Sequence, residues 1–203
     1  MDTTRQPRDN PDMVKSVSDM EAIQQHPITV EEFDRMAEAG VFGDRRIELI
    51  DGRLIDVPPQ GPPHAGTVSA FQFSLQTAFG RRALVRPQLS LPVAAHSQPE
   101  PDVAIVRWND SFYRDRHPSA EETFAVVEIS HTTLAFDRDV KRRLYGAGRV
   151  LEYWIIDVTH HRIEMYREPH DLGYAWEKRC GSGDSVSFEA FPDVVFSADE
   201  LLG

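Results

Sequence analysis

Three acidic side chains lie in short apolar segments of this sequence, where an ionised carboxylate is costly to bury. Glu128 stands within the run FAVVEIS, Asp102 precedes the run VAIV, and Glu48 lies within RIELI. A buried carboxylate without a partner costs several kcal/mol, so each needs a cation, a proton or hydrogen-bond donors. The three acids therefore predict a shared polar site, and a bound metal ion is the partner that this pattern favours.

The metal prediction depends on how Glu128 and Asp102 meet. Strand alternation places Glu128 on one face with Phe124, Val126 and Ser130. If the strand that begins at Asp102 is a neighbour, the two carboxylates lie together at one end of the sheet. Repulsion between the two carboxylates would raise the pKa of one of them. A hard cation such as Mg²⁺, or Mn²⁺ in its place, removes this repulsion. The chemistry predicted is activation of water for attack on a phosphate.

A lysine shortly downstream suits the same site. Lys141 lies on the helix expected after the Glu128 strand, where an ammonium can stabilise developing negative charge. Each residue also has a structural alternative. Lys141 can be a surface lysine whose stem packs on the core, Glu48 can pair with Arg46 or Arg53, and Asp102 can bind backbone at a strand entry.

The elements that position these residues are indicated by capping, turn and periodicity signals. Thr29 and Glu32 form a capping box, Asp51-Gly52 is a hairpin turn, and apolar residues at helical spacing follow His64. We expect helices at 29–39, 64–79 and 137–147, and strands at 46–50, 53–57, 83–86, 89–93, 102–106, 124–130, 151–158, 162–167, 174–180 and 185–188, with a last helical turn after Ser197. Residues 108–122 form a surface excursion bordering the cleft.

This order of elements predicts an α/β protein with a mixed (α+β) sheet and flanking helices. We expect a flexible N-terminal tail over 1–26 and one domain over 27–203. No apolar run approaches the roughly 20 residues of a membrane span. Cys180 is the only cysteine, which excludes an intrachain disulfide and favours a cytoplasmic location.

The net charge of −11 argues against a protein that simply coats nucleic acid. It argues less against a metal-dependent nuclease, because bound ions neutralise part of the acidity. Two basic clusters are candidate phosphate contacts: Lys141-Arg142-Arg143, and Arg81-Arg82 with Arg86 close by. A solvated basic face is the plainer interpretation of either cluster.

Taken together, the motifs resemble the Uma-type restriction endonuclease family of the PD-(D/E)XK nuclease superfamily. The matching runs are RIELIDGRLI from Arg46, PDVAIV from Pro101, VEIS from Val127, DRDVKRRLYGAG from Asp137 and EYWIID from Glu152. The resemblance implies a restriction endonuclease-like core and a Mg²⁺-dependent endonuclease acting on nucleic acid, DNA in particular. It assigns metal binding to Asp102 and Glu128, and a supporting catalytic role to Glu48.

One position departs from the superfamily pattern. Ser130 stands where a lysine normally follows the second acid, and relatives similarly carry the lysine on the next helix, where Lys141 lies. His64 and Tyr145 match recurrent family positions as side chains lining the site, with helix capping and core packing as their alternatives. A homodimer is expected, because cutting both strands of a duplex needs two sites.

Two other functions remain open at the level of sequence. A catalytically silent member of the same fold could bind nucleic acid or oligomerise, which the acidic charge and Ser130 would both suit. A glycosidase-like pair of carboxylates is also conceivable, but the chain has no aromatic-rich loops to hold a sugar.

Overall fold

The computed structural model describes residues 25–202. Nearly all of the tail predicted at 1–26 therefore lies outside the described residues. The elements, in chain order, are α1 (Val30–Glu38), β1 (Arg46–Ile50), β2 (Arg53–Val57), α2 (Pro62–Phe79), β3 (Ala83–Pro87), β4 (Val103–Arg107), η2 (Ala120–Glu122), β5 (Thr123–Ser130), α3 (Leu134–Phe136), η3 (Asp137–Lys141), α4 (Arg142–Ala147), β6 (Glu152–Asp157), β7 (Arg162–His170), β8 (Gly173–Cys180), β9 (Ser185–Val186), β10 (Phe196–Ser197) and α5 (Ala198–Leu202).

A six-stranded mixed sheet forms the centre of the structure, in the order β3-β4-β5-β6-β7-β8. Only the β5–β6 pair is parallel, and the chain crosses between these strands through α3, η3 and α4. The mixed α/β class predicted from the sequence is confirmed. The strand that carries Glu128 is an inner strand, flanked by β4 and β6.

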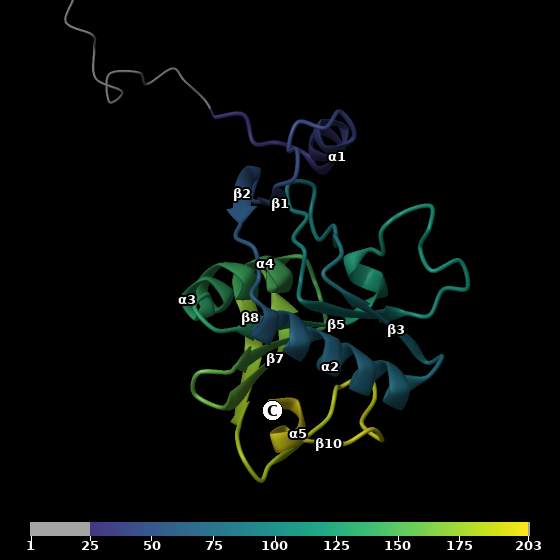
Figure 1. The fold of residues 1–203 in the computed structure, drawn as a ribbon, viewed down its shortest axis with the longest axis vertical. Coiled ribbons are helices and arrows are strands. Elements are labelled where there is room, and N and C mark those ends of the chain that lie inside the picture. Colours follow the sequence, from purple (N-terminus) through teal and green to yellow (C-terminus); the bar gives the residue numbers. More distant parts are fainter. Residues whose placement is uncertain (1–24, 203) are drawn as a thin grey trace, which may run out of the picture.

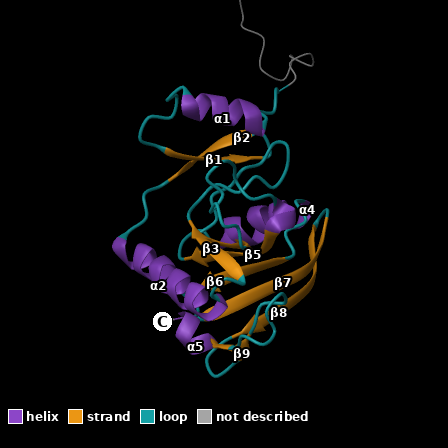
Figure 2. Ribbon diagram, turned by 90° about the vertical axis from the view of Figure 1, so that its right-hand side faces the viewer, coloured by secondary structure: helices purple, strands orange, loops and turns teal. Residues whose placement is uncertain are grey.

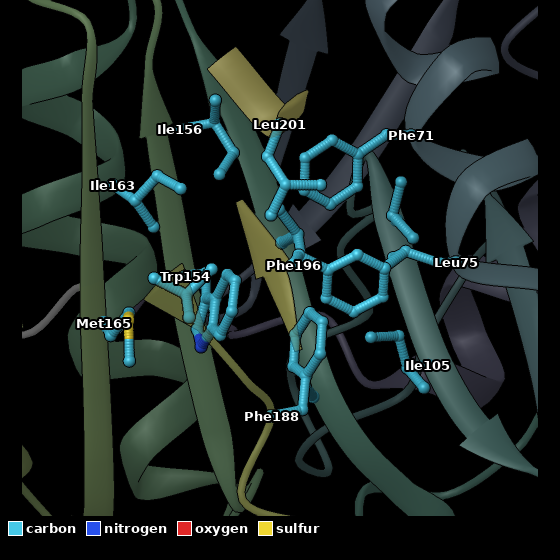
Figure 3. Packing of buried hydrophobic residues seen from close by; sticks show 14 of the residues in the cluster. Phe71, Leu75, Ile105, Trp154, Ile156, Ile163, Met165, Phe188, Phe196 and Leu201 are labelled. Carbon is cyan, nitrogen blue, oxygen red and sulfur yellow. The ribbon is translucent and has the colours of Figure 1, made fainter. Parts of the chain in front are cut away.

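Helices and loops cover the two faces of this sheet. On one face, α2 and the C-terminal segment bury Phe71, Leu75 and Leu201 against Ile105 and Ile156, and Figure 3 shows these side chains in contact across the layer. The opposite face is covered by α4 and by the segment between β3 and β4. Asp102 and Glu128 belong to this second face, because each is two residues from one of its core residues, Ala104 and Val126.

The N-terminal elements form a separate small layer. The α1 helix and the β1–β2 hairpin lie at the opposite end of the molecule from α5 and β9 (Figure 2). The capping box of Thr29 and Glu32 is present, and the hairpin has its predicted bounds. Asp51 and Gly52 have φ values of 49° and 75°, as a type I′ turn requires. A Cβ at Gly52 would lie 2.5 Å from Pro27 Cβ, so the turn needs glycine.

Three local predictions are wrong. Residues 89–93 form no strand; Leu91 and Val93 instead pack on the sheet from an irregular segment. Phe124 leaves the face of Glu128, because the β4–β5 register shifts beside Ile105 and leaves Phe124 unpaired, and its ring packs against the opposite core. The helix expected at 137–147 begins earlier, at Leu134, and its middle is a π-helix over Asp137–Lys141.

Candidate active site

Glu128 is buried in the sheet and receives three hydrogen-bond donors. Its Oε1 accepts bonds from Lys141 Nζ at 2.9 Å and from Tyr145 Oη at 2.8 Å. Its Oε2 accepts a longer bond of 3.3 Å from the backbone N–H of Asp102. The partners that a buried carboxylate needs are thus supplied by the neighbouring strand and by the helix that follows β5.

Asp102 lies just before β4, beside Glu128. Its Oδ2 accepts the backbone N–H of Ile129 at 2.9 Å. Its Oδ1 accepts His64 Nε2 at 2.9 Å and the Gln60 amide at 3.1 Å. The expected meeting of Asp102 and Glu128 therefore occurs, because β4 and β5 are antiparallel neighbours. His64 reaches Asp102 from the first turn of α2, so the capping alternative for His64 is wrong.

Lys141 contacts the carboxylates of both Glu128 and Glu48. Its Nζ lies 2.9 Å from Glu128 Oε1 and 3.4 Å from Glu48 Oε1, and Lys141 is only 7% exposed. The alternative of a surface lysine is therefore wrong. The alternative for Glu48 is wrong too: Glu48 is buried, while Arg46 pairs with Glu100 at 3.1 Å.

Asp137 belongs to the same cluster, although the sequence argument did not single it out. It is buried at the start of η3 and accepts hydrogen bonds from Ser130 Oγ and from Thr133 Oγ1. Ser130, which stands where the superfamily has lysine, thus ties β5 to the segment that carries Lys141. The one available signal was the spacing of Ser130, Thr133 and Asp137 around a strand-to-helix turn.

The protonation of the cluster follows from burial and from neighbouring charge. Burial raises the pKa of Glu128 to about 8, and the carboxylates of Asp102, Asp137 and Glu48 add to the rise against the opposing charge of Lys141. Burial alone would lower the pKa of Lys141, but the charges of Glu128 and Glu48 outweigh it, so the pKa rises and the ammonium stays protonated. This part of the molecule holds more negative than positive charge.

The pKa of Asp102 shifts the other way. Burial would raise it, but the hydrogen bond and charge of His64, the N–H of Ile129 and the charge of Lys141 together lower it.

Burial and the charge of Glu128 raise the pKa of Tyr145 well above its ordinary value, so its hydroxyl is a donor to Glu128. The ring of Tyr145 also packs against Tyr153 with centroids 5.1 Å apart, so contact with the site and core packing coexist.

These side chains face a pocket of about 490 Å³. Its walls come from the β1–β2 hairpin, the linker Pro58–Gly61, the start of α2, the ends of β4 and β5, and the turn after β5. Glu48, His64, Asp102, Glu128, Asp137 and Lys141 all line it. None of the residues 108–122 does, so the prediction that this excursion borders the cleft is wrong.

The donor set fits a hard divalent cation. Within residues 25–202, no three acidic, histidine or cysteine side chains converge closely enough to hold an ion alone. Mg²⁺ usually takes one or two carboxylates and keeps several waters, which two buried acids beside a pocket allow. The surplus of buried carboxylates over Lys141 favours the same ion. Asp102 and Glu128 are the residues that would hold it.

The predicted basic clusters have mostly internal partners. Lys141 is buried among acids, and Arg143 pairs with Asp51 at 3.2 Å. Arg81 and Arg82 pair with Asp110 and Asp193, each at 2.6 Å. Arg86 differs from all of these, because its buried Nη1 has no hydrogen-bond acceptor among residues 25–202. None of the helices within the described part of the chain has the length and apolar character to cross a bilayer.

The structure thus places buried acids and a buried lysine at one end of a six-stranded mixed sheet. A crystal structure described as that of "a putative nuclease belonging to DUF820 from Anabaena variabilis ATCC 29413" superposes with a TM-score of 0.67 at 19% sequence identity. The superposition covers 87% of this chain and 98% of that one. At this identity the likeness concerns the fold.

The sequence itself gives the family. Residues 30–199 match the Uma2 family model, described as "Putative restriction endonuclease", and the chain belongs to this family. No curated protein matches the chain. The resemblance inferred from the motifs is therefore confirmed, and the family is a nuclease family. The roles of the individual site residues stay predictions.

Proposed function

We propose that the protein is a Mg²⁺-dependent endonuclease that hydrolyses phosphodiester bonds of nucleic acid, with DNA as substrate. The observation that carries this proposal is the position of Lys141. Its ammonium contacts both Glu128 and Glu48, although Lys141 comes from a helix rather than from β5. The acid and lysine groups of a nuclease site are thereby assembled despite the serine at residue 130.

Each residue then has a distinct task. Asp102 and Glu128 would hold the cation, and the cation would supply charge neutralisation at the phosphate and a water of lowered pKa. His64 and the Ile129 N–H fix the orientation of Asp102. Lys141 keeps its proton, holds Glu128 and Glu48, and faces the pocket with positive charge where negative charge develops on the phosphate. Tyr145 donates a hydrogen bond to Glu128 and holds this carboxylate in place.

Two finer parts of the proposal concern the substrate and the oligomeric state. The choice of DNA follows from the restriction endonuclease description of the family. The homodimer follows from the geometry of cutting both strands, which needs two active sites.

The test is cleavage of supercoiled plasmid DNA in Mg²⁺ or Mn²⁺. We expect nicking or linearisation that a chelator abolishes, and a loss of at least about 100-fold in rate for Asp102→Asn and Lys141→Met, as for removal of a charge-stabilising group. Asp44→Asn, which replaces an exposed acid outside the pocket lining, is the matched control.

Equal cleavage by Asp102→Asn and by the unmodified protein would contradict the proposed site. If neither DNA nor RNA is cut and calorimetry detects no divalent ion in the folded protein, the catalytically silent interpretation replaces this one.

A further inference from the structure

Arg86 is a buried cation that has no acidic partner among residues 25–202. It lies on β3 and is 7% exposed, and its Nη1 is buried without a hydrogen-bond acceptor among the described residues. The other members of the same basic cluster, Arg81 and Arg82, both form ion pairs. In a chain of net charge −11, acidic partners are plentiful, so an unpaired buried guanidinium is unexpected.

The surroundings of Arg86 compensate for its burial only in part. Burial lowers the pKa of Arg86, and the nearby Tyr113 opposes this shift only weakly. The guanidinium lies 5.6 Å from the centre of the Tyr113 ring, a cation–π contact that replaces little of the lost hydration. A buried charge left unpaired destabilises the fold. The free protein therefore carries a cost at Arg86 that a bound anion would remove.

The position of Arg86 relates it to the candidate active site. Arg86 pairs with Ala104 across the β3–β4 ladder, and Ala104 is two residues from Asp102. Gln88, two residues beyond Arg86, reaches Asp102 Oδ1 at 3.4 Å. Arg86 thus lies on the same face of the sheet as Asp102, but on the neighbouring strand β3. The two residues are offset by roughly 7 Å along the strand direction. Phosphates of one strand recur about every 3.4 Å of helix rise, so an offset of roughly 7 Å corresponds to a phosphate about two steps along the strand.

The other groups around Arg86 are compatible with an anion. The charge of Arg86 also acts on His117 and lowers the pKa of His117, in addition to the larger effect of burial. The acids that also act on His117 are engaged elsewhere: Glu100 pairs with Arg46, and Asp34 accepts a bond from Gln98.

The loop that carries Tyr113 is held in a strained form above Arg86. Phe112 and Tyr113 have consecutive left-handed φ values of 56° and 55°, which non-glycine residues rarely adopt. Such strain persists only where the surroundings enforce it, and it is frequent in ligand clamps.

We propose that Arg86 binds a phosphate of the nucleic-acid substrate that lies close along the strand to the phosphate being cleaved. This inference rests on the proposed nuclease function and names a part of its substrate site. A guanidinium suits the task because its planar fork can bind two phosphate oxygens at once. The site would position the strand and would take no part in breaking the bond.

The test compares Arg86→Met with Arg82→Met, which removes an exposed, ion-paired arginine. Binding of a fluorescent DNA duplex is measured without divalent ions over a range of salt concentrations. We expect Arg86→Met to weaken binding about tenfold and to lower the salt slope by about one, whereas Arg82→Met changes both much less. Arg86→Lys, which keeps the charge but loses the fork, should lie between Arg86→Met and the unmodified protein.

The melting temperature separates this role from a structural one. Without ligand, Arg86→Met should melt at or above the temperature of the unmodified protein, because an unpaired buried charge is removed. Inorganic phosphate should stabilise the unmodified protein more than the variant. A variant that melts well below the unmodified protein, or that binds duplex equally well, overturns the proposal.

The two hypotheses fail in different ways. If the unmodified protein binds no nucleic acid but phosphate stabilises it through Arg86, the nuclease function fails while the anion site stands. If the protein binds and cuts DNA and Arg86→Met does both equally well, only the Arg86 site fails.

Discussion

At the scale of residues, the site depends on one lysine shared by buried carboxylates. Glu128 and Glu48 both lie within 3.4 Å of Lys141 Nζ. Sequence predicted this cluster because an acid in an apolar strand requires a partner, and Lys141 was the nearest downstream candidate. It did not predict Asp137 or the isolation of Arg86, since the partners of both residues depend on how loops far apart in the chain pack together.

Replacing Lys141 should cost stability as well as activity. Lys141→Met leaves two buried carboxylates facing each other without a cation, and breaking a buried pair on one side typically costs about 3 to 5 kcal/mol. We expect a loss of about 3 kcal/mol in the free energy of unfolding measured with urea. Lys178→Met on the exposed edge of β8 is the control and should change stability by less than about 0.5 kcal/mol.

A double variant shows whether the loss comes from the ion pair. Glu128→Gln combined with Lys141→Met should cost clearly less than the sum of the two single losses, because no charge of the closest pair is then left unpaired. Additive losses would mean that Lys141 stabilises the fold through packing alone.

At the scale of elements, the sequence predicted the helices and turns that are determined by residues close together in the chain. The hairpin and α1 have their predicted forms because turn and capping residues determine them. The π-helix of Asp137–Lys141 has no such signal. Contacts with other elements hold this segment: Asp137 accepts hydrogen bonds from Ser130 and Thr133, and Lys141 contacts Glu128. Segments of π-helix are frequent at functional sites.

Two helical glycines give a matched test of element packing. A Cβ on Gly146 of α4 would lie 2.1 Å from the Gly173 backbone oxygen of β8, whereas one on Gly66 of α2 meets nothing within 4 Å. Gly146→Ala should destabilise the protein by more than about 2 kcal/mol through overpacking, while Gly66→Ala should be neutral or stabilise by up to about 1 kcal/mol. Similar losses in both, measured by urea denaturation, would contradict the close approach of α4 to β8.

The turn before β5 should make stability depend on acid pH. Hydrogen bonds from Arg116 lower the pKa of Glu122 from 4.5 to about 2, against a smaller effect of burial, and Ser119 adds to the lowering. Because the folded-state pKa is the lower one, this stabilisation is present above about pH 4.5 and is lost as the pH falls toward 2. Glu122→Gln should therefore flatten the fall of the melting temperature over this range. An unchanged pH profile would mean that the pair with Arg116 contributes nothing.

At the scale of the whole molecule, the sheet brings together residues that are far apart in sequence. Glu48 comes from the hairpin layer, Asp102 and Glu128 from adjacent strands, and Lys141 from the crossover to the parallel strand β6. The order of elements predicted the mixed sheet, but it could not predict that the hairpin layer would close the pocket over the strand ends. The hairpin lies beside α1 and away from α5 (Figures 1 and 2). It places Glu48 near Lys141 and contributes residues to the pocket wall.

The most direct test of a cation-dependent site at Asp102 and Glu128 is a crystal of the protein soaked in Mn²⁺, with anomalous scattering recorded at the manganese edge. The account predicts a peak between the two carboxylates, about 2 Å from an oxygen of each, and loss of that peak in Asp102→Asn. An ordered pocket without a peak in a crystal that binds Mn²⁺ elsewhere, or an ion held by other residues, would contradict it.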